Sequence, residues 1–281
     1  MTTSGTLYLV GTPIGNLDDM TFRAIATLKN VDLIAAEDTR HTGKLLKHFQ
    51  IATPQISYHD HNRHQRQAQL LEKLRSGLNI ALVSDAGLPG ISDPGFELVA
   101  SAIDTEITVV PIPGVSAGLT GLIASGLSPE KFVFEGFLPP KKKDRHQLLT
   151  ELSQEPRTLI FYEAPHRLVK TLTDLLEHFE GDRPLVCARE LTKLHEEFWR
   201  GPLETALTHY QQHNPKGEFT LILAGASPQT DHEALTDAEI LAQLQALMQQ
   251  GMSRSGASRT LAQQLNLSRR HIYQLSTELE G

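Results

Sequence analysis

The chain has 281 residues, of which 40% are hydrophobic and 21% charged, and its formal net charge at pH 7 is −7. This length predicts two or three domains, and the negative charge argues against non-specific wrapping of nucleic acid by the whole surface. No apolar run approaches the roughly 20 residues that span a bilayer and the first residues do not form a secretion signal, so we expect a cytoplasmic protein.

The first predicted strand, residues 6–10, runs into a glycine loop. Residues 11–16 contain two glycines and Pro13, and a helix is predicted to follow. A second strand at 31–36 ends beside Glu37, where an acidic residue would meet a ribose in a dinucleotide site. The G-x-G-x-x-G fingerprint nevertheless fails, because Pro13 stands where a glycine is needed and lacks a backbone N–H that a pyrophosphate would use.

Polar side chains follow the second and third predicted strands. Asp38 can cap the next helix, whereas the charge of Arg40 is unfavourable there and suits a phosphate or a carboxylate across a cleft. The third strand ends in residues 57–64, which contain three histidines. Because no other Cys or His cluster completes a metal site, we expect no metal and assign His59 to a polar rim that binds a nucleotide.

The most informative loop follows a predicted strand at residues 80–83. Five of the twelve residues in 84–95 are Gly or Pro, and a strand at 107–110 ends in a similar loop at 111–118. Parallel strands present their carboxyl ends at one sheet edge, where ligands bind, so these loops predict one pocket lined by backbone groups. The pocket is poor in Lys and Arg and suits a zwitterionic or adenosine-like ligand. The alternative is a long connection in which Asp85 only caps a helix.

The strand and helix pattern changes after about residue 115. Short strands then follow one another without regular crossovers, which predicts a mixed sheet in a second α/β domain. We therefore expect two α/β domains, 1–114 with a parallel five-stranded sheet and 115–226 with a mixed sheet, separated by a cleft. A basic loop in the second domain is a candidate for contacts to a phosphate backbone. It contains Lys141, Lys142, Lys143 and Arg145.

The C-terminal segment, 233–281, predicts a small helical domain behind a linker. Two predicted helices around residues 266–268 form a helix-turn-helix-like pair. Arg269 and Arg270 open the second of these helices, where a nucleic-acid backbone would lie. A plain helical hairpin that only packs on the rest of the chain is the alternative.

Taken together, these motifs resemble one protein family. The segments that carry the likeness are 11–17, 36–40, 84–87, 93–95, 113–114, 161–167, 188–193 and 216–218. They are similar to the tetrapyrrole-methylase-type (class III) S-adenosylmethionine-dependent methyltransferases, and within them to the enzymes that modify small-subunit ribosomal RNA. The resemblance implies a homodimer, S-adenosylmethionine bound between two α/β domains, and methyl transfer to the ribose 2′-oxygen of a cytidine in the decoding region of 16S rRNA. It also implies cofactor contacts at Pro13, Asp85, Gly87, Ile91, Ser116, Ala117, Tyr162, Leu191 and Thr220.

The reaction implied by this resemblance requires a group that takes or shields the proton of the ribose hydroxyl. Candidates by residue type and by position at strand ends are Glu163, Glu190 and Asp38. Mutual salt bridges between the domains are the alternative role for such charged residues. The flanking RNA phosphates would be bound by Arg40, Arg167, Arg189 and Lys193.

Two other functions stay open at this point. A tetrapyrrole methyltransferase would share the methyl-donor pocket but would not need the basic loop or the helical domain. Its relatives usually have Gly-Asp-Pro where this chain has Ser84, Asp85 and Ala86, which disfavours a tetrapyrrole substrate. A non-enzymatic nucleic-acid-binding regulator would explain the helical domain and leave the glycine loops without a role.

Overall fold

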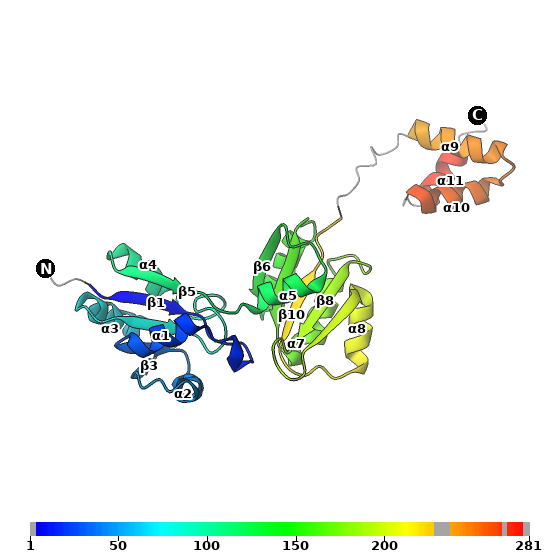
Figure 1. Ribbon diagram of the computed structural model, residues 1–281. Coiled ribbons are helices and arrows are strands. Elements are labelled where there is room, and N and C mark those ends of the chain that lie inside the picture. The colour runs from blue at the N-terminus through cyan, green and yellow to red at the C-terminus, as the bar shows by residue number, and fades with distance from the viewer. Residues whose placement is uncertain (1–3, 228–236, 266–268, 278–281) are drawn as a thin grey trace. The chain divides into compact units, whose positions relative to one another are not determined.

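The computed structural model describes residues 4–227, 237–265 and 269–277 (Figure 1). The chain forms two compact units, Met1–Ala226 and Ser227–Gly281. The first unit contains two five-stranded sheets and the second contains helices. The boundary predicted at residue 114 falls in the loop between the strands of the two sheets and stays a prediction.

The first sheet confirms the predicted parallel architecture. Its order is β3-β2-β4-β1-β5, and every neighbouring pair is parallel. The strands β2 and β4 are buried along their whole length, which is why the sequence shows them as unbroken apolar runs. The strands are β1 (Thr6–Val10), β2 (Leu33–Ala36), β3 (Gln55–Ser57), β4 (Ile80–Val83) and β5 (Thr108–Ile112).

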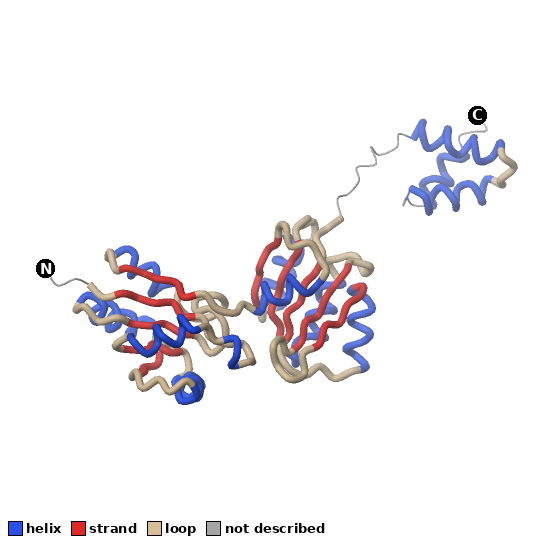
Figure 2. The backbone as a smooth tube through the Cα atoms, in the orientation of Figure 1, coloured by secondary structure: helices blue, strands red, loops and turns tan. Residues whose placement is uncertain are grey.

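Helices cover both faces of this sheet (Figure 2). Leu28 and Leu46 place α1 and α2 in the core on one face, whereas Leu70 and Leu98 place α3 and α4 in the core on the other. The neighbouring strands β1 and β4 are therefore followed by helices on opposite faces. Such a reversal opens a crevice at the carboxyl ends of the two strands. The helices are η1 (Leu17–Asp19), α1 (Phe22–Asn30), α2 (Thr39–His48), α3 (Arg63–Arg75) and α4 (Phe96–Asp104).

The second sheet is mixed, as predicted, with the order β6-β7-β10-β8-β9. The pair β6 and β7 is parallel, and the other pairs are antiparallel. One face packs against α6, α7 and α8, and Leu122 of α5 packs on the other. The elements are α5 (Ala117–Ser125), β6 (Phe132–Phe137), α6 (Lys142–Leu152), β7 (Thr158–Glu163), α7 (Pro165–Leu176), β8 (Pro184–Arg189), β9 (Glu197–Pro202), α8 (Leu203–Gln212) and β10 (Phe219–Leu223).

The second unit contains α9 (Asp237–Gln249), α10 (Arg254–Leu265) and α11 (Arg269–Thr277). Ile240, Leu261 and Ile272 contribute one buried side chain from each helix to a shared core, which confirms the predicted C-terminal helices. The predicted turn at residues 266–268 lies outside the described residues. Among the described helices of the whole chain, none has the length and apolar character needed to cross a membrane.

Candidate active site

A cavity of about 450 Å³ lies where the loops after β1 and β4 face the second sheet. This is the crevice that the strand order of the first sheet creates, and its size is that of a small-molecule site. The second sheet closes it with residues from the ends of β6, β7, β8 and β10. Its lining is Ile14, Glu37, Asp85, Ala86, Gly87, Leu88, Ile91, Ser92, Asp93, Ser116, Ala117, Phe137, Tyr162, Glu163, Ala164, Pro165, Ala188, Leu191, Lys193, Glu218, Phe219 and Thr220.

The loops of the first sheet are pinned to one another by backbone contacts. Thr12 and Gly87 exchange two backbone hydrogen bonds, of 2.9 and 3.1 Å, and the Thr12 hydroxyl donates to the Ser84 carbonyl at 3.2 Å. Gly11 meets Gly114 so closely that a Cβ on Gly11 would lie 2.7 Å from the Gly114 Cα. The glycines therefore fix the shape of the crevice because no side chain fits between these loops.

Carboxylates form one wall of the cavity. The Glu37 side chain accepts a hydrogen bond from the Asp85 N–H at 3.3 Å, and Asp85 accepts one from the Asp38 N–H at 3.1 Å. Burial raises the pKa of Glu37. Burial, with the nearby negative charge of Glu37, also raises the pKa of Asp93 to about 6. Because like charges gathered in a partly buried site favour a cation, this wall suits a positively charged ligand and repels phosphates.

Tyr162 supplies the aromatic part of the opposite wall. Its hydroxyl oxygen accepts a hydrogen bond from the Gly118 N–H at 3.1 Å, which connects β7 to the first turn of α5. Its ring makes edge contacts with Phe134 and Phe137 at centroid distances of 5.0 and 5.7 Å. Burial raises the pKa of Tyr162, so the phenol is neutral at physiological pH and is held in one orientation.

The loop after β8 reaches the cavity through Leu191. Its neighbours Glu190 and Thr192 both have positive φ, 51° and 67°, a conformation that non-glycine residues adopt only when the surroundings hold them. Burial alone would raise the pKa of Glu190, but hydrogen bonds from Lys193 and from the Glu218 N–H hold it below its ordinary value. The Lys193 ammonium lies 2.7 Å from Glu190 and 2.8 Å from Glu218. The ion pairs thus hold the loop that presents Leu191.

Glu163 ends β7 with its side chain buried. The carboxylate accepts hydrogen bonds from the Ala164 N–H at 2.8 Å and from the Thr171 hydroxyl. The Arg167 guanidinium lies 3.3 Å away and also donates to the Leu138 carbonyl at 2.8 Å. Glu163 therefore stabilises the first turns of α7 beside the cavity.

The sequence comparisons agree with this geometry. Residues 6–207 match the model of the tetrapyrrole (corrin/porphyrin) methylases. This chain belongs to that family. It is 60% identical over 277 residues to the ribosomal RNA small subunit methyltransferase I of Synechocystis, and the match covers 99% of each protein. It is 51% identical over 272 residues to the protein of the same name from Streptococcus pyogenes, with 97% of this chain and 94% of that relative covered.

Solved structures of tetrapyrrole methylases share the fold at low identity. The methyltransferase CobJ has a TM-score of 0.61 and 19% identity, with 79% of this chain and 95% of that chain covered. A uroporphyrin-III C-methyltransferase from Thermus thermophilus, complexed with S-adenyl homocysteine, has a TM-score of 0.58 and 18% identity, with 79% and 98% covered. At this level of identity the likeness shows the fold of this methylase family.

The predicted cofactor residues gather around the cavity of this methylase with one exception. Pro13 lies outside the lining, and its neighbour Ile14 takes that place. The loops that are predicted to form one pocket, 84–95 and 111–118, therefore do meet at one cavity. The predicted residues in the lining are Asp85, Gly87, Ile91, Ser116, Ala117, Tyr162, Leu191 and Thr220.

The three candidates for the catalytic base have different positions. Glu163 lines the cavity but is occupied by Ala164, Thr171 and Arg167. Glu190 lies behind the lining in the ion pairs with Lys193. Asp38 caps α2 and pairs with Arg40 at 2.7 Å, an arrangement that lowers the pKa of Asp38. None of these carboxylates is placed as an unpaired base, and we assign the proton to none of them.

The basic cluster of the second sheet needs one correction. Arg145 was expected to face RNA with its lysine neighbours, but it is 2% exposed. Its guanidinium lies 2.7 Å from Asp174 and donates to the carbonyls of Pro139 and Pro140 at 2.9 and 3.0 Å. A guanidinium buried in this way and paired with Asp174 cannot reach a phosphate, so the exposed cluster consists of Lys141, Lys142 and Lys143.

The other residues predicted to bind RNA differ in how accessible they are. The Arg40 side chain is 89% exposed. His59 is partly buried and contacts Asn62 at 3.2 Å. Arg189 pairs with Glu197 at 3.3 Å. The backbone of α11 begins at the predicted Arg269 and Arg270, whose side chains lie outside the described residues.

Sequence reasoning missed part of the cavity wall. The sequence indicates Glu37 only as a possible ribose contact and Asp93 only as part of a motif, and it gives no signal for Phe137, yet all three line the cavity. The available signal was position, since Glu37 directly follows a predicted buried strand whose end meets the same sheet edge as the glycine loops.

Proposed function

We propose that this protein binds S-adenosylmethionine in the cavity between its two sheets and transfers the methyl group to ribosomal RNA of the small subunit. The observation that carries the proposal is the cavity wall itself. Carboxylates from two loops of the first sheet, Glu37 after β2 and Asp85 and Asp93 after β4, converge on a space walled on the other side by Tyr162 and small side chains. A sulfonium and an ammonium, both cationic, are stabilised by such a wall.

The residues present fit S-adenosylmethionine better than a dinucleotide. Among the described residues of the lining, Lys193 is the single Lys or Arg, and its ammonium is engaged by Glu190 and Glu218. The carboxylates Glu37, Asp85 and Asp93 can accept hydrogen bonds from ribose hydroxyls and an ammonium. When bound, S-adenosylmethionine supplies a methyl group that is already electrophilic, so the chain has mainly to position the accepting oxygen in line with it.

The RNA substrate is proposed from the relatives. Proteins named ribosomal RNA small subunit methyltransferase I match this chain over nearly its full length. Within the chain, the exposed Lys141, Lys142 and Lys143 lie just after β6, whose last residue, Phe137, lines the cavity. This exposed positive patch supports the proposal, because it offers charges to which RNA phosphates would be bound.

We propose the ribose 2′-oxygen of a cytidine in the decoding region of 16S rRNA as the accepting atom. This follows the family resemblance, and it gives the reaction a chemical signature. The 2′-hydroxyl is the group that attacks the neighbouring phosphate when RNA is cleaved by alkali, so a methylated position resists alkaline cleavage. Base methylation leaves that cleavage intact, and the two outcomes can therefore be separated.

The test incubates purified protein with radiolabelled S-adenosylmethionine and one of three acceptors: isolated small ribosomal subunits, naked 16S rRNA or a porphyrin precursor. We expect label in the RNA of one of the first two, in an alkali-resistant dinucleotide that contains 2′-O-methylcytidine. Label in a base would overturn the accepting atom, and label only in the porphyrin precursor would overturn the RNA substrate. Absence of label from all three would overturn the enzyme assignment and favour a regulator.

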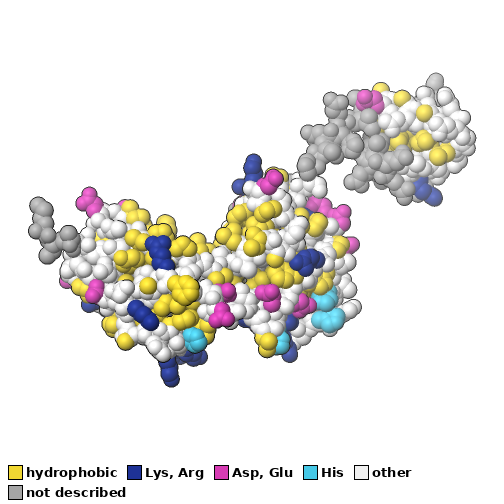
Figure 3. Space-filling model, viewed as in Figure 1, with side chains coloured by type: hydrophobic (Ala, Val, Ile, Leu, Met, Phe, Trp, Pro, Cys, Tyr) yellow, Lys and Arg dark blue, Asp and Glu magenta, His cyan; other side chains and the backbone are white. Residues whose placement is uncertain are grey.

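We also propose that the protein works as a homodimer in the cytoplasm, where this RNA is found. Large apolar side chains are exposed on the first unit (Figure 3), among them Phe22 at 93% and Ile123 at 79%. Ile123 and Leu119 line a second hollow of about 520 Å³ next to Ser116, so a second copy there would cover apolar surface beside the site. Light scattering should give twice the chain mass for the wild type and the monomer mass for Ile123→Asp, and a monomeric wild type would contradict the dimer.

A further inference from the structure

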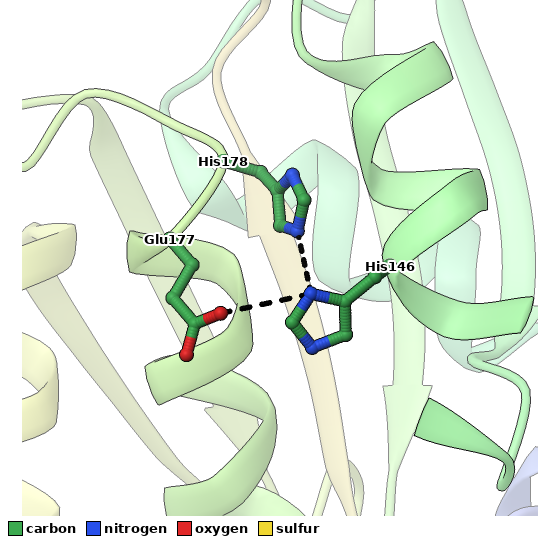
Figure 4. A group of neighbouring side chains, drawn as sticks. All are labelled: His146, Glu177 and His178. Carbon is green, nitrogen blue, oxygen red and sulfur yellow. Dashed lines mark hydrogen bonds and ion pairs between the residues drawn. The ribbon is translucent and has the colours of Figure 1, made fainter. Parts of the chain in front are cut away.

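A cluster of potential metal ligands lies outside the cavity, between α6 and the end of α7 (Figure 4). His146 comes from α6, and Glu177 and His178 follow α7. The His146 Nδ1 lies 3.0 Å from the His178 Nε2 and 3.6 Å from a Glu177 carboxylate oxygen. The three ligand atoms lie within 4.8 Å of one another.

The hydrogen bonds around the two rings determine where their protons are. On the other side of the His146 ring, Nε2 lies 3.2 Å from a carboxylate oxygen of Asp174. A carboxylate accepts hydrogen bonds, so His146 Nε2 carries the proton. In a neutral imidazole the other nitrogen then presents a lone pair, and in His146 this is the Nδ1 that faces His178.

Thr150 fixes the second ring in the same way. The Thr150 hydroxyl donates its one proton to the His146 carbonyl at 2.9 Å, so its oxygen can only accept from the His178 Nδ1, 3.3 Å away. His178 Nε2 is then also a lone pair. When both rings are neutral, two imidazole lone pairs and a carboxylate therefore face one another, an arrangement that a bound cation would stabilise.

We propose that this cluster binds a divalent transition-metal ion, with Zn²⁺ as the best match. Two imidazole nitrogens and one carboxylate oxygen form a ligand set typical of Zn²⁺, with bonds of about 2.0–2.2 Å. A single ion can reach two nitrogens that are 3.0 Å apart, and the half-exposed Glu177 side chain can rotate to complete the set. Mg²⁺ and Ca²⁺ prefer oxygen ligands and fit two imidazoles poorly.

The outer contacts support the same conclusion. Histidines that bind metals generally donate the other ring N–H to a carboxylate or another oxygen, which fixes the ring orientation. His146 does so to Asp174, which is itself buried and held by Arg145 at 2.7 Å, and His178 does so to Thr150. The ion would join α6 to the end of α7 and so steady the helix whose first residues belong to the exposed lysine cluster.

The site is tested with Zn²⁺ alone on the untagged, full-length protein after treatment with a chelator. Competition with a chromophoric chelator should show one tight Zn²⁺ per chain, and Co²⁺ should give the visible absorption of a low-coordinate nitrogen and oxygen site. Zn²⁺ at a hundredfold excess over its dissociation constant should raise Tm by roughly 5–10 °C. Absence of tight Zn²⁺ binding at neutral pH would overturn the proposal and leave a proton shared between the rings.

Variants locate the ion. His178→Ala removes a ligand and should weaken Zn²⁺ binding by more than about 100-fold, whereas Thr150→Val removes only the outer contact and should weaken it about 10- to 100-fold. The control is His213→Ala, because His209 and His213 also stack, at a centroid distance of 4.5 Å. Unchanged affinity in His178→Ala and in Glu177→Gln would overturn the site, as would loss of binding in His213→Ala alone. Circular dichroism and the apo Tm verify that each variant is folded.

Discussion

The two sheets contribute to the cavity in opposite ways. The first sheet provides loops in which side chains are absent where loops meet, as at Gly11 and Gly114. It also provides the cavity carboxylates Glu37, Asp85 and Asp93, which form no ion pair with a Lys or Arg in the described part of the chain. The second sheet provides charged residues that neutralise one another, as in the pairs Lys193 with Glu190 and Arg145 with Asp174. Under the proposed function, the first sheet provides the charges that bind the ligand, whereas the charges of the second sheet mainly hold loops and helices in place.

This difference has an electrostatic reason. A buried charge without a partner is costly, so an ion pair inside a fold is usually a structural commitment. The carboxylates Glu37, Asp85 and Asp93 instead line the cavity, where a ligand can supply the positive charge. The comparison can be tested by substituting charged residues in both halves and glycines in the first half, and by measuring stability and ligand binding separately.

The largest effect is expected for Arg145→Ala. This change leaves the Asp174 carboxylate buried and removes the donor of two backbone carbonyls. Removal of one partner of a buried ion pair costs about 3–5 kcal/mol, so the free energy of unfolding in urea should fall by that amount. The control is Arg40→Ala, whose side chain is 89% exposed and whose loss should change stability by less than about 0.5 kcal/mol. If Arg145→Ala lowered the free energy of unfolding as little as Arg40→Ala, the ion pair with Asp174 would have no structural role.

Gly11→Ala probes the first sheet and should have the next largest effect. The new Cβ would lie 2.7 Å from the Gly114 Cα, so the loops after β1 and β5 must separate. We expect a loss of about 1–3 kcal/mol in the free energy of unfolding and, because the crevice changes shape, at least a tenfold weaker affinity for S-adenosylmethionine by calorimetry.

The matched control for this glycine is Gly43→Ala in α2. There the new Cβ meets only the end of the flexible Gln55 side chain at 3.2 Å. Alanine favours a helix over glycine by up to about 1 kcal/mol, so this variant should be as stable as the wild type or more stable. If Gly11→Ala behaved like Gly43→Ala, the close approach of the two loops would not shape the cavity.

The same comparison explains what the sequence could predict. The glycine loops were recognisable because a close backbone approach permits only glycine, so the requirement is visible in the residue type itself. The parallel sheet was recognisable because strands buried on both faces must be apolar throughout, as β2 and β4 are. These requirements are local, and no knowledge of a partner is needed to see them.

The role of a charged residue, by contrast, cannot be recognised from its residue type. Arg145 follows three lysines in sequence, yet the helix α6 turns it inward to Asp174, which is distant in the chain. Glu190 and Glu163 have the chemistry of a base, but their partners decide their roles. The cluster of His146, Glu177 and His178 was likewise invisible, because its ligands come from two elements whose packing the sequence does not state. The role of a charged residue that depends on a partner distant in sequence can therefore be assigned only from the structure.

The second half also contains charged residues that are exposed and can be tested separately, namely Lys141, Lys142 and Lys143. Replacing all three by Ala should leave stability and S-adenosylmethionine affinity unchanged and weaken RNA binding. For three contacts to single-stranded RNA, the slope of log affinity against log salt concentration should shrink by about 2. The control with the same change in charge is the triple Ala variant of Lys29, Lys44 and Lys47, and an equal change of slope in both would show that only net charge matters.

The effect expected for Asp93 depends on pH. Burial raises its pKa to about 6, above the ordinary value of about 4 for Asp. The folded state therefore binds the proton more tightly than the unfolded state, and the free energy of unfolding should fall as the pH rises from about 4 to about 6. Asp93→Asn removes this penalty, so its Tm should exceed that of the wild type above pH 6 and equal it near pH 4.

The same titration should be visible in ligand choice. S-adenosylmethionine carries a sulfonium charge that S-adenosylhomocysteine lacks, so an ionised Asp93 favours the former by a Coulomb term of about 1 kcal/mol, roughly fivefold. The ratio of the two affinities should therefore drop as the pH falls through about 6 in the wild type and stay flat in Asp93→Asn. The control is Asp104→Asn, because Asp104 is exposed, and its affinity ratio should change with pH as in the wild type. A ratio that is independent of pH in the wild type would place the sulfonium away from the carboxylate wall and remove the electrostatic reason for distinguishing the two sheets.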